Sequence, residues 1–205
     1  MARASGDGPW IVGLSVERRG MSAETASARR TTSDLGAVLV RGALELDWLR
    51  VGLGLGVGTL DVDQMFGALA GPAFVGRVAP RLLEAGVLSL GLELEARFVY
   101  LRGELGHQAV SGRIVQGHGY AVAWARLGSA EPWLAIGASR AQASIDLPAP
   151  VGAQTLVLAT PWPVDVVGGL DLRMALPSLR LVVLATLAFV VPRPEDLRFA
   201  VGVAF

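Results

Sequence analysis

Residues 87–101 read VLSLGLELEARFVYL, and the two faces of this run differ sharply if the chain is extended. The even-numbered side chains from Leu88 to Tyr100 are all aliphatic or aromatic, whereas the odd-numbered ones include glycine, serine, glutamate and arginine. Successive side chains of a β-strand point to opposite faces, so this period of two predicts a strand with one fully apolar face. The stretches 51–58 and 197–205 alternate in the same way, which predicts an all-β protein.

The composition is that of a very apolar chain without a membrane helix. Of 205 residues, 52% are hydrophobic and 18% are charged, and the mean hydropathy is +0.50, which excludes a disordered chain. The longest apolar run, 181–191, is far shorter than the roughly 20 residues of a spanning helix, and residues 1–8 lack the apolar segment of a secretory signal peptide. The net charge of zero gives no sign of a nucleic-acid partner. With no cysteine and only two histidines, we expect no metal site and no cofactor.

Ten stretches have the alternation of strands, and the links between them alternate in length. Long links at one end and tight turns at the other are typical of an outer-membrane barrel. We therefore predict a closed antiparallel up-and-down transmembrane β-barrel of about ten strands, with eight as the alternative. The barrel would cover 10–205, after a short periplasmic segment at 1–9. The predicted strands are 10–18, 35–46, 49–60, 73–82, 87–101, 113–126, 131–146, 162–175, 179–191 and 197–205.

The first short link supports this interpretation residue by residue. A two-residue turn at Asp47 and Trp48 would pair Leu44 with Val51 and keep both strands in the same register from there. In that register both strands place apolar residues on one face, so the turn and the alternation agree.

The two faces are assigned by what each environment tolerates. The polar face is rich in glycine and alanine and carries charges of both signs, which suits a crowded lumen where charges pair. An arginine that faces lipid would cost roughly 2–4 kcal/mol near the bilayer midplane, so the large aliphatic side chains are expected to face lipid. The charges are expected to plug the barrel through ion pairs or to line a narrow constriction. The predicted lumen cluster is Arg41, Glu45, Arg77, Arg81, Glu93, Glu95, Arg97, Asp171, Arg173 and Arg198.

The tryptophans lie at the ends of the predicted strands. Four of them fall at the short-turn end, and one falls near the long-loop end with several phenylalanines and a tyrosine. Aromatic belts at opposite strand ends fit the two interfaces of a bilayer. We therefore predict an aromatic girdle that contains Trp10, Trp48, Trp124, Trp133 and Trp162.

The last nine residues carry a resemblance to a known class of proteins. Phe199, Val201, Val203 and Phe205 lie on one face of an alternating apolar segment that ends in an aromatic residue. This segment resembles the C-terminal strand of bacterial outer-membrane β-barrel proteins, and the strand rhythm is similar to that of small OmpA/OmpX-type barrels. The resemblance implies that these four residues are the signal for the barrel-assembly machinery. It also implies a location in the lipid bilayer of the bacterial outer membrane.

Three further motifs have weaker chemical signals, and each has a plainer structural interpretation. The alternating glycines at 52–58 lack the spacing of a nucleotide-binding loop and are better explained by close packing in the lumen. His107 and His118 could belong to a hydrolase at the barrel rim, but no motif links them to a nucleophile. Asp61 and Asp63 could hold a hard cation weakly, although a solvated loop is the more ordinary explanation.

These observations favour a non-enzymatic structural or interaction protein. Its long loops would be presented to an extracellular or envelope protein partner, because loops on a rigid scaffold often carry recognition. The first alternative is a narrow pore for ions or small solutes, with the arginine and glutamate cluster as its constriction. A hydrolase active at the rim is the remaining alternative, and we expect no enzymatic activity.

Overall fold

The computed structural model describes residues 10–24, 30–62, 68–105, 108–147, 154–159, 164–176, 181–191 and 197–204. These residues form one antiparallel sheet of eleven strands. No helix in this part of the chain is long and apolar enough to cross a membrane. The strands are β1 (Trp10–Glu24), β2 (Arg30–Glu45), β3 (Leu49–Val62), β4 (Leu69–Ala85), β5 (Leu88–Leu105), β6 (Gln108–Ala125), β7 (Ala130–Leu147), β8 (Gln154–Ala159), β9 (Val164–Leu176), β10 (Leu181–Val191) and β11 (Leu197–Ala204).

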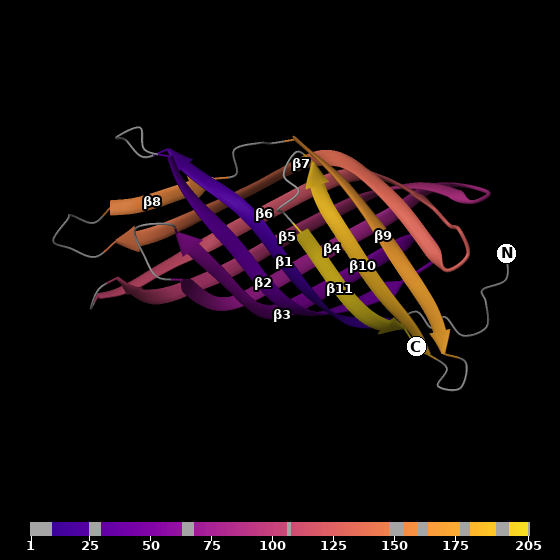
Figure 1. Ribbon diagram of the computed structural model, residues 1–205, viewed down its shortest axis with the longest axis horizontal. Helices are drawn as coiled ribbons and strands as arrows, with labels where there is room; N and C mark the ends of the chain where they lie inside the picture. Colours follow the sequence, from indigo (N-terminus) through magenta and orange to yellow (C-terminus); the bar gives the residue numbers. More distant parts are fainter. Residues whose placement is uncertain are drawn as a thin grey trace.

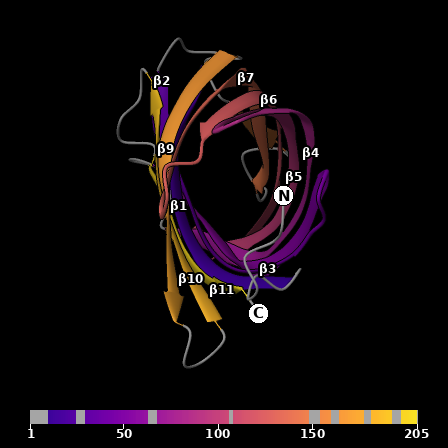
Figure 2. The same cartoon turned by 90° about the vertical axis from the view of Figure 1, so that its right-hand side faces the viewer.

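Ten of these strands close into a barrel. Each strand from β1 to β7 pairs with the next, the order continues through β9, β10 and β11, and β11 pairs back with β1. The strands cross the long axis obliquely in Figure 1 and curve around a common interior in Figure 2. Closure matters in a bilayer because unpaired backbone groups are not tolerated in hydrocarbon. The predicted ten-strand antiparallel barrel is therefore confirmed.

The predicted tight turns are also present. Leu44 pairs with Val51, and the backbone N–H of Leu46 donates to the carbonyl of Leu49 at 2.8 Å across the first turn. Gly86 and Gly128 occupy two further turns with φ of 64° and 65°, a conformation that glycine adopts without a steric penalty. We call the end with these turns the turn end, and the opposite end the loop end.

β8 was not predicted, because the link 147–161 was expected to be a loop. It pairs with β7 from Gln142↔Ala159 to Leu147↔Gln154, and it meets β1 at Ser22↔Ala159. β7 pairs with β9 over a different part of its length, Ala130–Ala138. Strands β1 to β7 therefore run through both ends of the described wall. At the loop end β8 lies between β7 and β1, whereas at the turn end β9, β10 and β11 do. Figure 1 shows β8 at the left and β9 to β11 toward the right.

Several strands extend farther toward the loop end than the sequence predicts. β1 and β2 stay paired out to Glu24↔Arg30, and β5 and β6 out to Leu105↔Gln108, where the loops 19–34 and 102–112 were expected. β5, β6 and β7 have 18 residues each, whereas about 9–11 residues of tilted strand cross a bilayer. The barrel is thus long enough to extend well beyond the membrane.

The polarity of the two faces inverts along the strands. Outward side chains of the turn half are apolar, as in Leu53, which is 72% exposed, and Leu55. Toward the loop end the outward side chains become polar, and Arg18 and Asp34 form an exposed ion pair at 2.5 Å there. Arg113, which lies toward the loop end of β6, is also exposed. This is the pattern expected if lipid surrounds the turn half and water surrounds the rest, which we call the collar.

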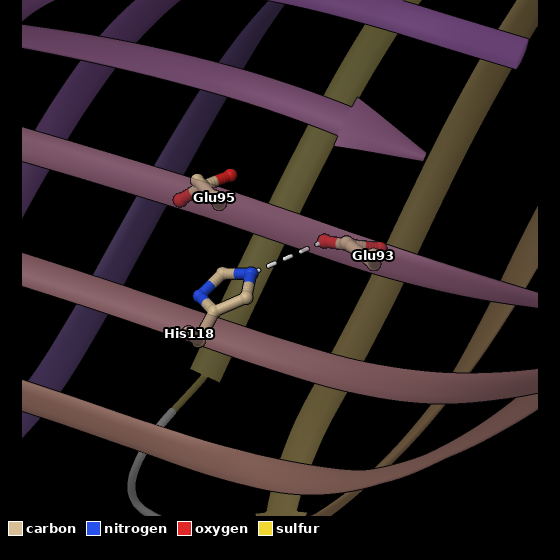
Figure 3. A group of neighbouring side chains, drawn as sticks. All are labelled: Glu93, Glu95 and His118. Carbon is tan, nitrogen blue, oxygen red and sulfur yellow. Dashed lines mark hydrogen bonds and ion pairs between the residues drawn. The ribbon is translucent and has the colours of Figure 1, made fainter. Parts of the chain in front are cut away.

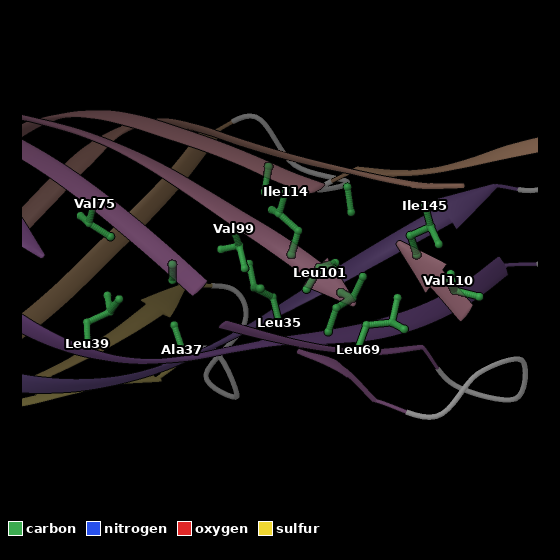
Figure 4. Close-up of a cluster of buried hydrophobic side chains, with 14 residues drawn as sticks. Leu35, Ala37, Leu39, Leu69, Val75, Val99, Leu101, Val110, Ile114 and Ile145 are labelled. Carbon is green, nitrogen blue, oxygen red and sulfur yellow. The ribbon is translucent and has the colours of Figure 1, made fainter. Parts of the chain in front are cut away.

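Aliphatic side chains fill the interior of the collar, and we call them the apolar plug. They come from β2 to β7 and point toward one another across the interior in Figure 4. Every one of them is at most 5% exposed. The plug consists of Leu35, Ala37, Leu39, Leu60, Leu69, Ala73, Val75, Val99, Leu101, Val110, Ile114, Ala141, Ala143 and Ile145.

Glycines of β3 allow this close packing. A Cβ on Gly58 would lie 2.6 Å from the Cγ1 of Val99, and a Cβ on Gly56 would lie 1.9 Å from the carbonyl oxygen of Val38. Both contacts are far shorter than van der Waals distance. Gly56 and Gly58 thus fit the interpretation as a packing motif, whereas a Cβ on Gly52 would have its nearest contact at 3.4 Å, an ordinary van der Waals distance.

Candidate functional site

Charged side chains fill the interior on the turn side of the plug, in two layers. The upper ion-pair layer consists of Glu17, Arg41, Glu95 and Arg97. Arg41 donates to Glu17 Oε1 at 2.6 Å and to Glu95 Oε2 at 2.9 Å, and its Nε donates to Ser15 Oγ at 2.9 Å. Arg97 donates to Glu17 and, at 3.4 Å, to Glu95 Oε1. Two arginines and two glutamates make this layer neutral, which is the arrangement that buried charges require.

The lower ion-pair layer lies nearer the turn end, and part of it is built on β2 to β5. Arg50 donates to Glu45 Oε1 at 2.9 Å, and Arg81 donates to the same oxygen. Arg77 donates to Glu93 Oε2 at 2.5 Å. Two guanidinium groups therefore share one carboxylate oxygen here.

The rest of the lower layer comes from β7 and β9. Arg173 donates to Glu131 Oε2 at 3.1 Å, and Arg126, in the turn after β6, donates to Glu131 Oε1 at 2.9 Å. The hydrogen bond to Glu131 raises the pKa of Arg126 above its usual value. The indole Nε1 of Trp133 donates to Asp171 Oδ1 at 3.1 Å, which fixes the orientation of that ring.

A buried polar cluster ties β1 to β7 and β9 near the point where β7 changes partner from β9 to β8. Arg19 on β1 donates to Asp165 Oδ2 at 2.7 Å and also to Ser139 on β7. Ser139 and Tyr120 donate to the same carboxylate, Tyr120 at 3.1 Å. Asp165 on β9 has no exposed surface. We call these four residues the seam latch.

Glu93, Glu95 and His118 form a group with the spacing of metal ligands. Their ligand atoms lie within 4.8 Å of one another, and His118 Nε2 is 3.3 Å from Glu93 Oε1 (Figure 3). Both carboxylates already accept hydrogen bonds from guanidinium groups, Glu93 from Arg77 and Glu95 from Arg41. A divalent cation would therefore add positive charge to layers in which these carboxylates are already compensated. The group is better explained as part of the ion-pair layers.

The barrel brings most of the predicted lumen cluster together. Arg198 pairs through its backbone with Glu17, but its side chain lies outside the described part of the structure. The other nine residues belong to the two ion-pair layers: Arg41, Glu45, Arg77, Arg81, Glu93, Glu95, Arg97, Asp171 and Arg173. The structure adds interior charges that sequence reasoning did not single out, namely Glu17, Arg19, Arg50, Glu131 and Asp165.

The predicted aromatic girdle needs correction. Trp10 and Trp48 are exposed on the outside at 54% and 62%. Trp124 and Trp133 pair across β6 and β7 and line an interior cavity instead, because they share the parity of the inward residues on these strands. Trp162 lies outside the described residues.

Other predicted sites are placed as follows. His118 is in the middle of β6 and inside the barrel, not at the rim as expected, because β6 begins at Gln108. His107 and Asp63 lie outside the described residues, and Asp61 is exposed on the collar.

The predicted assembly signal lies on the last strand. Phe199 and Val201 are exposed on β11, Val203 is half-buried, and Phe205 lies outside the described residues. Their proposed role in assembly stays a prediction.

Comparison with known proteins identifies the fold but no family. No model of a known protein family matches the sequence, and no curated protein matches it. Among solved structures, the chain is similar to the outer-membrane protease OmpT from Escherichia coli, with a TM-score of 0.51 and 11% identity, covering 99% of this chain and 96% of that one. It is also similar to the translocator domain of the autotransporter NalP from Neisseria meningitidis, with a TM-score of 0.53 and 12% identity, covering 98% and 89%.

The fold and the apolar exterior together define the class of protein. OmpT is a protein of the outer membrane, and the outward apolar belt of the turn half of this chain is the surface that a bilayer requires. The chain has the fold of OmpT and of the NalP translocator domain, and its outward apolar belt is that of a membrane-spanning β-barrel.

The expectation of a non-enzymatic protein is overturned by the same comparison. OmpT is a protease, so this fold does carry enzymatic activity in another protein. The sequence led us to expect no enzymatic activity, with a hydrolase at the rim as the remaining alternative, because no motif links the histidines to a nucleophile. That argument fails because catalytic groups can come from separate strands, and no local motif then records them.

Proposed function

We propose that this chain is a sealed barrel that holds the collar and its loops outside the outer membrane, where they bind a partner molecule. The observation that carries the proposal is the apolar plug, which fills the collar with side chains at most 5% exposed. A dry aliphatic layer excludes the continuous water path that ions need. The narrow pore considered from the sequence is disfavoured for this reason.

The upper ion-pair layer supports a sealed interior from the other side. Side chains of Glu95 and Arg97 are only 2% and 3% exposed, and each carboxylate faces a guanidinium. A water path through this layer would require its ion pairs to separate. Separation is costly because each charge would then be buried without its partner. Two successive layers therefore obstruct the interior: the apolar plug and the upper ion-pair layer.

The exterior of the collar supports a role outside the membrane. Its outward side chains are polar, including Arg18, Asp34, Arg113 and Arg140, so water surrounds it. The described strands continue well beyond the length of about 9–11 residues that crosses a bilayer. Loops on such a rigid scaffold are a common place for recognition.

Single-channel recording tests the proposal. Protein inserted into a planar bilayer should give no discrete conductance steps. A hollowed variant with Leu35→Ala, Leu101→Ala and Ile114→Ala should leak, because it removes side chains at the centre of the plug. The matched control carries three lipid-facing changes, Leu53→Ala, Leu55→Ala and Leu94→Ala, and should stay silent. Steps in the unmodified protein that change size in an Arg97→Ala, Glu93→Ala variant would overturn the proposal and establish a pore.

A further inference from the structure

A chamber remains in the interior between the upper ion-pair layer and the turn end. It consists of two adjoining cavities of about 160 and 130 Å³, which share Arg77, Asp171 and Arg173 in their walls. Side-chain exposure rises along the interior, from 3% for Arg97 to 27% for Arg77 and 25% for Arg173. The chamber is therefore closed on the side of the plug and open to water on the side of the turn end.

The walls of the larger cavity combine aromatic rings with guanidinium groups. Trp124 and Trp133, a cross-strand pair on β6 and β7, form one side. Arg50 and Arg77 come from β3 and β4, across the ring, and Arg173 comes from β9. Because Trp133 is hydrogen-bonded to Asp171, its ring is held in one orientation.

The wall of the larger cavity holds more arginines than carboxylates: Arg41, Arg50, Arg77, Arg81 and Arg173 against Glu93, Glu131 and Asp171. The Nε atoms of Arg77 and Arg173 are buried and have no hydrogen-bond partner in the described structure. Arg50 and Arg81 share a single oxygen of Glu45. The side chains of Arg77 and Arg173 are still 27% and 25% exposed, so a ligand with acceptor oxygens would gain free energy by accepting hydrogen bonds from their accessible N–H groups.

We propose that this chamber binds a small aromatic anion, namely a single-ring carboxylate. A cavity of about 160 Å³ matches the size of an engineered cavity of about 150 Å³ that accommodates benzene. The flat ring would stack against Trp124 and Trp133, and the carboxylate would accept hydrogen bonds from Arg77 and Arg173. This site lies at the end of the barrel opposite to the collar and is independent of the sealed-barrel proposal.

Ligand titration of the full chain in lipid nanodiscs, which leave both ends open, tests the inference. Benzoate is compared with benzyl alcohol and benzylamine, with calorimetry and tryptophan fluorescence as readouts. Benzoate should bind saturably, and the neutral and cationic compounds should bind at least tenfold more weakly. Absence of saturable benzoate binding, or equal binding of benzyl alcohol, would overturn the inference.

A matched pair of variants locates the site. Arg173→Gln should weaken benzoate binding about tenfold, and the barrel should still fold because Glu131 keeps its hydrogen bond to Arg126. Arg18→Gln removes an exposed arginine from the collar and should leave binding unchanged. If Arg173→Gln does not fold, Trp124→Leu serves instead and should weaken binding and reduce the fluorescence change. Unaltered affinity in a folded chamber variant would show that benzoate binds elsewhere and would contradict the assignment.

Discussion

Asp165 is a charged residue of the interior with no exposed surface and three hydrogen-bond donors around it. Its carboxylate is fully buried and accepts hydrogen bonds from Arg19, Ser139 and Tyr120, which lie on three different strands. Arg19 is itself only 12% exposed, so its charge depends on this partner. The seam latch thus links β1 to β7 and β9 through one ionised group.

Replacing Asp165 with asparagine should destabilise the barrel by about 3 kcal/mol, because it leaves the charge of Arg19 buried without compensation. Reversible urea unfolding in lipid vesicles measures this. The double variant Arg19→Gln, Asp165→Asn removes both charges and should recover part of the loss. A single variant as stable as the unmodified protein would mean that the latch contributes nothing.

Residue parity explains which interior charges could be predicted. Arg97 and Glu95 lie in a strand with strict alternation, so their inward direction follows from the sequence. Arg19 has the parity of Gly13, Ser15 and Glu17 on the polar face of β1, but it was missed because the predicted strand ended at residue 18. Asp165, near the start of β9, has the same parity as Asp171 and Arg173, so its inward direction also follows from the alternation although it was not singled out.

At the scale of elements, β8 makes the loop end different from the turn end. It lies between β7 and β1, where β9, β10 and β11 no longer provide the partner. Without it, the upper part of β7 would have one unpaired edge in the described structure. A short strand of six residues thus completes the wall of the collar.

A proline in β8 should open the collar locally. Val157→Pro removes the backbone N–H of the residue paired with Ser144 and restricts the strand, since proline cannot donate a hydrogen bond to the ladder. Hydrogen exchange of the amides at 142–147 should become at least tenfold faster, whereas amides at 130–138, paired with β9, should be unchanged. Equal protection of both segments in the variant would show that β8 does not hold the collar closed.

The transmembrane part of each strand could be predicted, and the collar could not. Lipid outside favours large apolar residues at most outward positions, as in the run from Leu88 to Tyr100, and this pattern is easily detected. In the collar most of the described outward side chains are polar, as in Arg18, Asp34 and Asp61, and the sequence of 19–34 has the composition of a loop. The residues of β8, QTLVLA, show no alternation that would separate them from the surrounding link.

At the scale of the whole molecule, the inversion of polarity sets the position of the membrane. The lipid belt ends where the outward side chains of β3 change from Leu53, Leu55 and Val57 to Thr59 and Asp61. Beyond that level the barrel resembles a water-soluble one, with an aliphatic interior and a polar surface. The outer face of one continuous sheet is therefore suited to lipid along the turn half and to water along the collar.

Arginine scanning of β3 should locate this boundary. Leu53→Arg places a charge in the middle of the belt and should destabilise the barrel by about 2–4 kcal/mol in lipid. Asp61→Arg, in the same strand but on the collar, should change stability by less than about 0.5 kcal/mol. Equal effects at both positions, measured by unfolding in vesicles, would contradict the proposed membrane position.

The account rests centrally on an interior that is sealed at the plug and open below it, and cysteine accessibility measures this most directly. The chain has no cysteine, so single substitutions report without background. In nanodiscs a small charged thiol reagent should modify Ala79→Cys in the chamber and Ala70→Cys on the outside of the collar. Ala143→Cys in the plug should react at least a hundredfold more slowly in the folded barrel. Once the protein is unfolded, it should react as fast as the other two variants. Comparable reaction of Ala143→Cys in the folded barrel would mean that water crosses the plug and that the barrel is not sealed.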